Sequence, residues 1–163
     1  MAIKKNFTTE EWTKILESPM LAGMAVSAAE PSGLWGALKE AIASGSALAT
    51  AKSEASSNDL IKAVVADFET SEGRTSVQEA LSKSFAKAKP ADVVQGSIST
   101  LGEVSRILDK KAPRDSAAFK AWLRDISLNV AEAANEGGFL GFGGVPVSDA
   151  EKATLADINR ALA

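Results

Sequence analysis

The chain has no histidine, no cysteine and no tyrosine among its 163 residues. Without histidine it lacks the side chain that most often moves protons near neutral pH, and Ser-His and Cys-His nucleophile pairs are excluded. Zinc sites built from Cys and His and the Glu-x-x-His sites of ferritin-like bundles are excluded for the same reason. Lysine, serine and carboxylates leave other chemistry open, but no constellation points to a reaction. We therefore expect a protein that is not an enzyme.

The sequence also lacks a long apolar run. The longest weakly charged stretch, residues 20–50, contains three charged residues and is interrupted by Pro31 and Gly33. It falls short of the roughly 20 consecutive apolar residues that cross a bilayer. The residues after Met1 include two lysines but no apolar region of the kind that signal peptides have. Together with the missing cysteine, this predicts a cytoplasmic protein.

An excess of positive charge is missing as well. The net charge is −3, and the sequence pI is near 5.1. The densest basic cluster, Lys110, Lys111 and Arg114, is flanked by Asp109 and Asp115, which is typical of a solvated helix end. Nucleic-acid-binding proteins usually gather Lys and Arg on one face, so no nucleic-acid partner is expected.

What the chain does have is a hydrophobic fraction of 45% and clear helix-start signals. Thr8 and Glu11 form a capping-box pattern, and Phe7 and Trp12 occupy the two hydrophobic positions that flank such a cap. A first helix is predicted over residues 9–17. Ser18-Pro19 predicts a new start, because proline is favoured in the first turn of a helix.

Similar signals divide the rest of the chain, and no segment alternates with a period of two. Further helices are predicted at 19–29, at 33–53, from Ser57 or Asn58 to Gly73, from a capping box of Ser76 and Glu79, from Pro90 to before Pro113, over the apolar positions from Phe119 to Ala133 with a stop at Gly137-Gly138, and from a capping box of Ser148 and Glu151. The prediction is an all-α, single-domain bundle of seven to eight amphipathic helices over residues 1–163, with a loop at 137–147. Residues 19–29 carry no charge, so we expect them at the centre of the bundle.

Four carboxylates near the end of the chain form a candidate site for calcium or magnesium. Glu132 and Glu136 are four residues apart and share one helix face, while Asp149 and Glu151 open the last helix. If the loop folds back, all four could offer the oxygen ligands that these cations prefer. The alternative is that the first two are solvated and the last two stabilise a helix N-terminus.

A second acidic turn, Asp67, Glu69 and Glu72, precedes Gly73. It lacks the regular spacing of a calcium-binding loop. We interpret these three carboxylates as solvated.

The loop at 137–147 contains five glycines together with Phe139, Leu140 and Phe142. It lacks the Lys-Ser/Thr of a phosphate-binding loop. Two interpretations remain open. Either the aromatic side chains fill a gap in the core, or they stay exposed and contact a partner or a membrane surface.

Residues 130–137 (VAEAANEG) and 147–155 (VSDAEKATL) resemble the signature of TerB-like tellurite-resistance proteins, in which an Ala-rich helix, an acidic turn and an amphipathic helix follow one another. That family is all-helical and of similar size, with an acidic divalent-ion site proposed near such turns. The resemblance implies Glu136 and Glu151 as candidate ligands. Here Asn135-Glu136-Gly137 replaces the usual Asp-Gly, and the Gly/Phe-rich loop is inserted before Ser148.

The sequence therefore favours a non-enzymatic helical interaction module, or a stress-related one, that binds a protein partner or associates with itself. A divalent-cation-binding protein and a peripheral membrane protein are the alternatives. No cofactor other than calcium or magnesium is expected.

Overall fold

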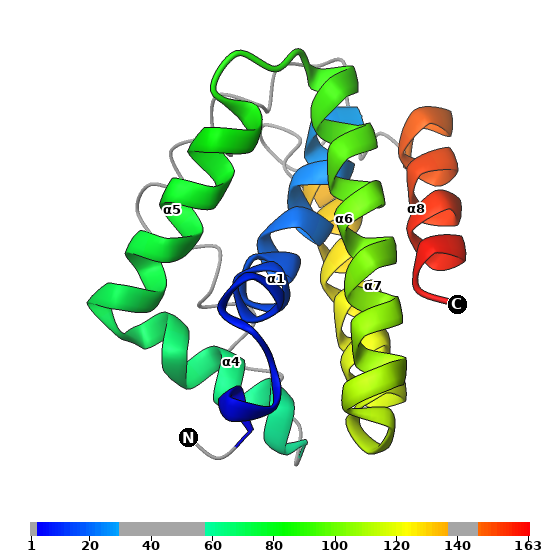
Figure 1. The fold of residues 1–163 in the computed structure, drawn as a ribbon. Coiled ribbons are helices and arrows are strands. Elements are labelled where there is room, and N and C mark those ends of the chain that lie inside the picture. The colour runs from blue at the N-terminus through cyan, green and yellow to red at the C-terminus, as the bar shows by residue number, and fades with distance from the viewer. Residues whose placement is uncertain (1–2, 30–57, 137–146) are drawn as a thin grey trace.

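The computed structural model describes residues 3–29, 58–136 and 147–163, with the side chains of 133–136 left aside. Over these ranges the chain forms one short 3-10 helix and six α-helices, and no strand (Figure 1). The elements are η1 (Lys4–Asn6), α1 (Thr9–Ala29), α4 (Asp59–Glu69), α5 (Ser71–Phe85), α6 (Pro90–Lys111), α7 (Pro113–Glu136) and α8 (Asp149–Ala161). The all-α prediction is confirmed, whereas the described ranges contain six α-helices against the seven to eight predicted for the chain.

Helix α1 lies at the centre of this arrangement. It packs against α6, α7, α8, α5 and α4, so every other α-helix of the described part contacts it. Figure 1 shows α1 in the middle of the view, with α5 on the left and α6, α7 and α8 on the right. The uncharged second half of α1 is buried from Met20 to Val26, which confirms its predicted central position.

The predicted break at Ser18-Pro19 is wrong, because α1 continues through Pro19 to Ala29. Proline has no N–H, so the carbonyl of Ile15 loses the donor that residue 19 would normally supply. The hydroxyl of Ser18 donates to that carbonyl oxygen instead, at 2.7 Å. Ser18 and Pro19 are both buried, so the packing that surrounds them keeps the helix whole.

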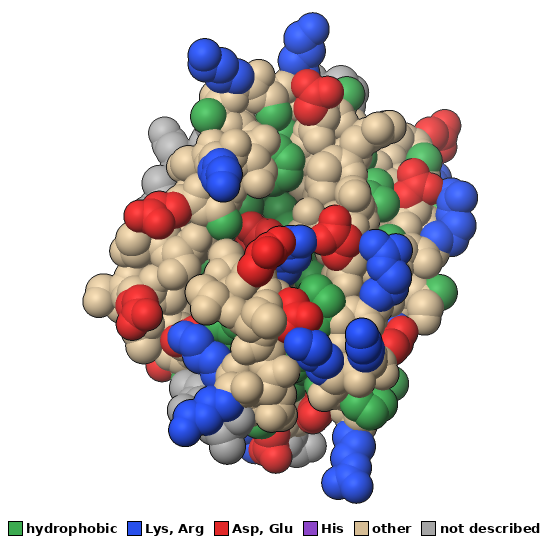
Figure 2. Space-filling model, viewed as in Figure 1, with side chains coloured by type: hydrophobic (Ala, Val, Ile, Leu, Met, Phe, Trp, Pro, Cys, Tyr) green, Lys and Arg blue, Asp and Glu red, His purple; other side chains and the backbone are tan. Residues whose placement is uncertain are grey.

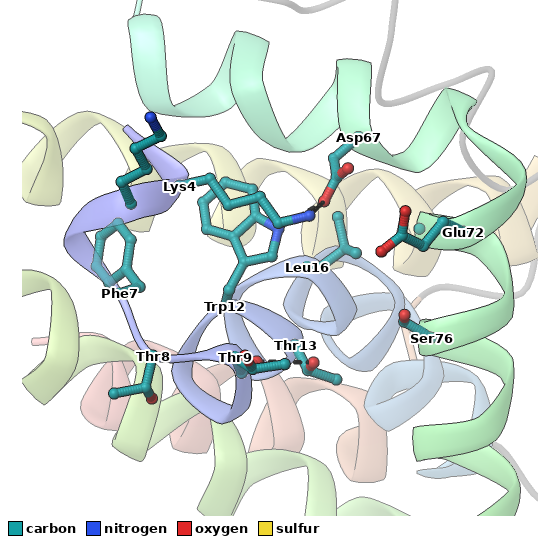
Figure 3. A pocket seen from close by; sticks show the side chains of 12 residues that line it. Lys4, Phe7, Thr8, Thr9, Trp12, Thr13, Leu16, Asp67, Glu72 and Ser76 are labelled. Atoms are coloured by element: carbon teal, nitrogen blue, oxygen red, sulfur yellow. Dashed lines mark hydrogen bonds and ion pairs between the residues drawn. The ribbon is translucent and has the colours of Figure 1, made fainter. Parts of the chain in front are cut away.

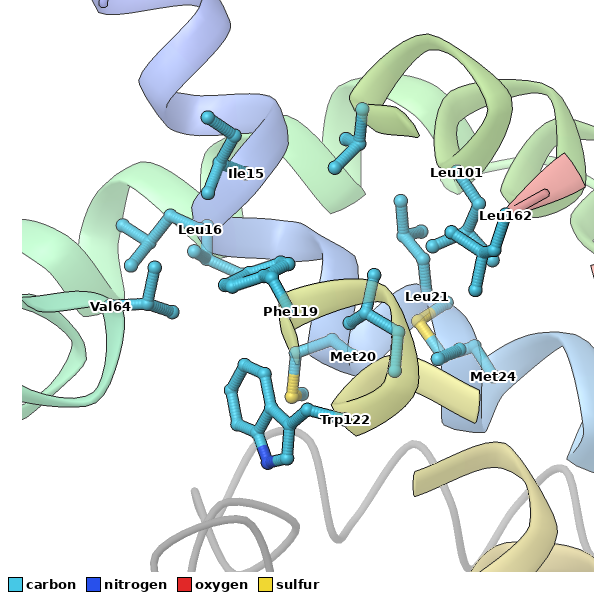
Figure 4. Close-up of a cluster of buried hydrophobic side chains, with 14 of the residues drawn as sticks. Ile15, Leu16, Met20, Leu21, Met24, Val64, Leu101, Phe119, Trp122 and Leu162 are labelled. Atoms are coloured by element: carbon cyan, nitrogen blue, oxygen red, sulfur yellow. The ribbon is translucent and has the colours of Figure 1, made fainter. Parts of the chain in front are cut away.

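The hydrophobic core joins α1 to all its neighbours (Figure 4). Leu16, Leu21, Leu101 and Phe119 are at most 1% exposed, and each fully buried side chain of this size contributes roughly 1.5–3 kcal/mol. The side chains labelled in Figure 4 come from four helices and the C-terminal residues: Ile15, Leu16, Met20, Leu21, Met24, Val64, Leu101, Phe119, Trp122 and Leu162. All these elements therefore contribute to one hydrophobic cluster.

Most helix starts follow the predicted signals. Glu11 and Thr8 exchange both capping-box hydrogen bonds, Asn58 accepts from the amides at the start of α4, and Ser148 and Glu151 form the box that opens α8. Pro90 is the first residue of α6, as predicted, and α6 ends before Pro113, which begins α7. The predicted helix at 33–53 lies outside the described residues.

The start of α5 differs from the prediction. Its cap is Thr70, whose hydroxyl accepts from the amide of Gly73, and Ser76 and Glu79 lie inside the helix. Gly73 therefore sits in the first turn of α5 and does not end α4. A Cβ atom at Gly73 would overlap the carbonyl oxygen of Asp67, so the glycine permits the sharp corner between the two helices.

No helix in the described ranges is long and apolar enough to cross a membrane.

Candidate functional site

A cavity of about 410 Å³ opens between the beginning of α1, the end of α4 and the beginning of α5 (Figure 3). Its floor is apolar, and its rim carries charged groups and hydroxyls. The lining residues are Lys4, Lys5, Phe7, Thr8, Thr9, Trp12, Thr13, Leu16, Asp67, Glu72, Gly73 and Ser76. This set brings together segments that lie about 60 residues apart in the sequence.

The first turn of α1 positions the aromatic side of the cavity. The capping box of Thr8 and Glu11 fixes where the helix begins, with heavy-atom distances of 2.8 and 3.2 Å. The rings of Phe7 and Trp12 then meet across the cap, with centroids 5.8 Å apart. Both side chains are buried, so the wall they form is held by packing as well as by the cap.

Asp67 forms the centre of the polar side. Its Oδ2 accepts a hydrogen bond from the indole N–H of Trp12 at 2.6 Å and another from Nζ of Lys4 at 2.9 Å. The Asp67 side chain is 11% exposed and that of Lys4 is 41% exposed. The Lys4 ammonium also lies 5.9 Å from the centroid of the Trp12 ring, within the range of a cation–π interaction. Asp67 is therefore not solvated, and our interpretation of it from the sequence is wrong.

The corner between α4 and α5 places a second carboxylate beside Asp67. The hydroxyl of Thr70 donates to the Asp67 carbonyl oxygen at 2.6 Å and accepts from the amide of Gly73 at 2.9 Å. This closes the chain into a tight reversal before α5. Figure 3 shows Glu72 and Ser76 directed from α5 toward the space in front of Asp67. Glu72 is exposed, as predicted for a solvated carboxylate.

A second group of charges lies where α1 meets α6. Nζ of Lys14 contacts Glu103 at 2.6 Å and Glu10 at 3.2 Å, and these carboxylates raise the Lys14 pKa, Glu103 most of all. Figure 2 shows basic and acidic side chains meeting in the middle of this face, between α5 and α6. Nearer the end of α6, Lys111 hydrogen-bonds to Glu11 at 2.6 Å and so holds the pKa of that carboxyl below its usual range.

Glu17 is the unusual member of that group, because it is only 8% exposed. No described residue donates a hydrogen bond to its carboxylate. Burial raises the pKa of Glu17 from 4.5 to about 7; Lys14 lowers it and Glu103 raises it further. Glu17 does not line the cavity. We therefore expect its raised pKa to affect the stability of the fold and not the binding of a ligand in the cavity.

The four carboxylates predicted to bind a cation are only partly described. Glu132, near the end of α7, and Asp149, at the start of α8, are exposed, whereas Glu151 is 2% exposed and caps α8. Its Oε2 accepts from the Ser148 amide at 2.9 Å, while Oε1 is buried and has no hydrogen-bond partner among the described residues. The side chain of Glu136 lies outside the described residues.

Within the described ranges, no three acidic side chains are grouped closely enough to hold a metal ion. Phe139, Leu140 and Phe142, the predicted partner-binding residues, also fall outside those ranges. The loop hypothesis and the cation hypothesis both stay predictions.

The sequence did not single out Trp12 and Asp67 as a pair. Trp12 was recognised only as part of a helix cap, and Asp67 only as part of an acidic turn. They lie 55 residues apart, and neither local pattern contains a signal for the other.

Comparison with known proteins leaves the cavity as the main guide to function. No family model, no curated protein and no solved structure matches this chain. The resemblance to TerB-like proteins therefore stays a prediction from the sequence.

Proposed function

We propose that this chain is a cytoplasmic, non-enzymatic helical binding module, and that the cavity between α1, α4 and α5 is its binding site. The observation that carries this proposal is the buried Asp67 carboxylate at the edge of a cavity of about 410 Å³. Burying a carboxylate is costly unless it is paired. Here the pairing comes from Trp12 and Lys4.

The lining groups suit recognition better than catalysis. Leu16 and Trp12 offer an apolar floor, and Glu72, Ser76 and Thr13 surround it with acceptors and hydroxyls. Small-molecule sites combine these two features, with a few polar groups that fix the orientation of the ligand. The serine and threonine hydroxyls have no histidine to activate them, since the chain contains none.

The test is a thermal-shift screen of the wild-type protein against a panel of small amines, carboxylates, sugars and nucleosides. A ligand that binds only the folded state raises the melting temperature. Ser76→Trp fills the cavity from α5 and should abolish the response. Ser82→Trp, on an exposed position of the same helix, is the matched control and should keep it. A panel without any response, or a response that Ser76→Trp leaves intact, contradicts the proposal.

A second candidate function is divalent-cation binding near the start of α8. The observation that favours it is the buried Oε1 of Glu151, which has no hydrogen-bond partner in the described part of the chain and could coordinate a calcium or magnesium ion. Saturating Ca²⁺ or Mg²⁺ should then raise the melting temperature of the wild-type protein, and Glu136→Ala should remove the effect. An unchanged melting temperature rejects this function.

A further inference from the structure

The ammonium group of Lys4 occupies a position in the cavity that would suit the ammonium group of a ligand. Its Nζ is 2.9 Å from Oδ2 of Asp67 and 5.9 Å from the centroid of the Trp12 ring. A carboxylate and the face of an aromatic ring are the two groups that recognise organic cations in binding sites. Lys4 therefore makes the contacts that such a ligand would make.

A ligand can replace Lys4 at the Asp67 carboxylate without disturbing the core. Lys4 belongs to η1, a three-residue 3-10 helix with no buried residue, and its side chain is 41% exposed. The Asp67 carboxylate is far more buried, at 11% exposed, and its indole partner is fixed in the core. The acceptor is thus rigid, while the cation that occupies it is tethered to a short surface turn.

The other carboxylate oxygens in the cavity also favour a positively charged ligand. Both hydrogen bonds to the Asp67 side chain end on Oδ2, and no described residue donates to Oδ1. Glu72 lines the same space and forms no ion pair with a described residue. Two carboxylates and two lysines line the cavity, and among the described residues only Lys4 forms an ion pair with either carboxylate. Lys5, which also lines it, forms no ion pair within the described ranges.

We propose that the cavity binds the alkylammonium group of a small aliphatic amine, and that Lys4 is a tethered internal occupant which the amine displaces from Asp67 and Trp12. This inference rests on the proposed function and names its ligand class. Lys4 then lowers the apparent affinity for free amines. If Lys4 holds the position about nine-tenths of the time, its removal lowers the half-saturating amine concentration about tenfold.

The experiment uses n-butylammonium, which has the length of a lysine side chain. Lys4→Ala vacates the position, and Lys4→Met vacates it while keeping an apolar stem, in case the alanine variant loosens η1. Lys83→Ala is the matched control, because Lys83 is an exposed lysine of α5 that does not line the cavity. Melting temperature and the NMR signal of the Trp12 indole N–H are followed at constant ionic strength, with butyrate and 1-butanol as the anionic and neutral probes of similar length.

We expect n-butylammonium to raise the melting temperature of both Lys4 variants and to shift the Trp12 signal in a saturable way. Half-saturation should come at about one-tenth of the concentration needed for the wild type or for Lys83→Ala. Adding Asp67→Asn to Lys4→Met should abolish the shift. Equal responses to n-butylammonium and 1-butanol, or an unmoved Trp12 signal, overturn the inference.

The two proposals fail separately. If the Lys4 variants ignore n-butylammonium but the wild type binds a neutral or anionic member of the panel in a way that Ser76→Trp blocks, the binding module stands and the amine assignment is rejected. If n-butylammonium binds the Lys4 variants while no member of the panel binds the wild type, the ammonium position stands and the proposed function is rejected.

Discussion

The indole N–H of Trp12 donates a 2.6 Å hydrogen bond to Oδ2 of Asp67, and this bond ties the first turn of α1 to the last turn of α4. Both residues are buried, with 3% of Trp12 and 8% of the whole Asp67 residue, backbone included, exposed. A buried donor that loses its acceptor costs about 1–3 kcal/mol. The same bond that shapes the cavity therefore contributes to the stability of the fold.

Asp67→Ala should lower the free energy of unfolding by about 2–3 kcal/mol, because it leaves the Trp12 N–H and the Lys4 ammonium without their shared acceptor. Asp67→Asn keeps an oxygen acceptor but loses the charge, so its cost should be smaller. Urea unfolding measures both. Equal effects of the two variants, or a loss under about 0.5 kcal/mol for Asp67→Ala, would show that the bond contributes little.

Ser18→Ala should destabilise the protein by about 1–3 kcal/mol, because the buried Ile15 carbonyl then has no donor in place of the missing Pro19 N–H. Pro19→Ala restores that N–H. In the Pro19→Ala background, Ser18→Ala should cost about 1 kcal/mol less than in the wild type. If the effects of the two substitutions are additive in this double-mutant cycle, the Ser18 hydroxyl does not take the place of the missing Pro19 N–H.

Gly73→Ala should destabilise the protein by about 1–3 kcal/mol, because its methyl group would overlap the Asp67 carbonyl oxygen at the corner between α4 and α5. Gly102→Ala in α6 is the matched control. The space at Gly102 is open, with the nearest atom 4.0 Å away, so alanine should stabilise α6 by about 0.5–1 kcal/mol. Denaturant unfolding measures both, and effects of the same sign would contradict the geometry of the corner.

Glu17 should make stability depend on pH between about 4.5 and about 7. Its pKa is raised in the folded state, so the folded protein holds this proton more tightly than the unfolded chain does. Stability is then highest while Glu17 is protonated, falls as the pH rises from 4.5 to 7, and is constant above that range. The shift from 4.5 to about 7 corresponds to at most about 3 kcal/mol.

Glu17→Gln should remove most of this loss, which urea unfolding at pH 5 and pH 8 detects as a smaller difference between the two conditions. Glu79→Gln, at an exposed position of α5, should keep the wild-type difference. Each variant is compared with itself at two pH values, so any pH-independent cost of burying the amide side chain of Glu17→Gln cancels. A wild-type protein that is equally stable at both pH values would argue against a buried, raised-pKa carboxyl.

Local signals in the sequence predicted much of the fold. The capping boxes of Thr8 with Glu11 and of Ser148 with Glu151 each need only four consecutive residues, and Pro90 marks a start by itself. These features depend on neighbours in the chain, so the pattern and the structure agree.

The wrong predictions share one cause, which is the influence of distant packing. Pro19 looked like a helix start, but the buried surroundings of Ser18 keep α1 continuous. Gly73 looked like a helix end, but it accommodates the close carbonyl of Asp67. The candidate site was missed for the same reason, because Trp12 and Asp67 meet only once α1 and α4 pack together.

The most direct test of the proposed site is the indole N–H signal of Trp12 in ¹H–¹⁵N spectra of the wild-type protein, assigned with Trp12→Phe and followed during titration with whichever panel compound raises the melting temperature most. We predict a saturable shift of that signal and of the backbone amides of Thr13 and Gly73, while the amides of exposed Leu128 and Asp149 stay in place. A compound that stabilises the protein while the Trp12 signal stays unmoved would contradict the assignment of the cavity as the binding site.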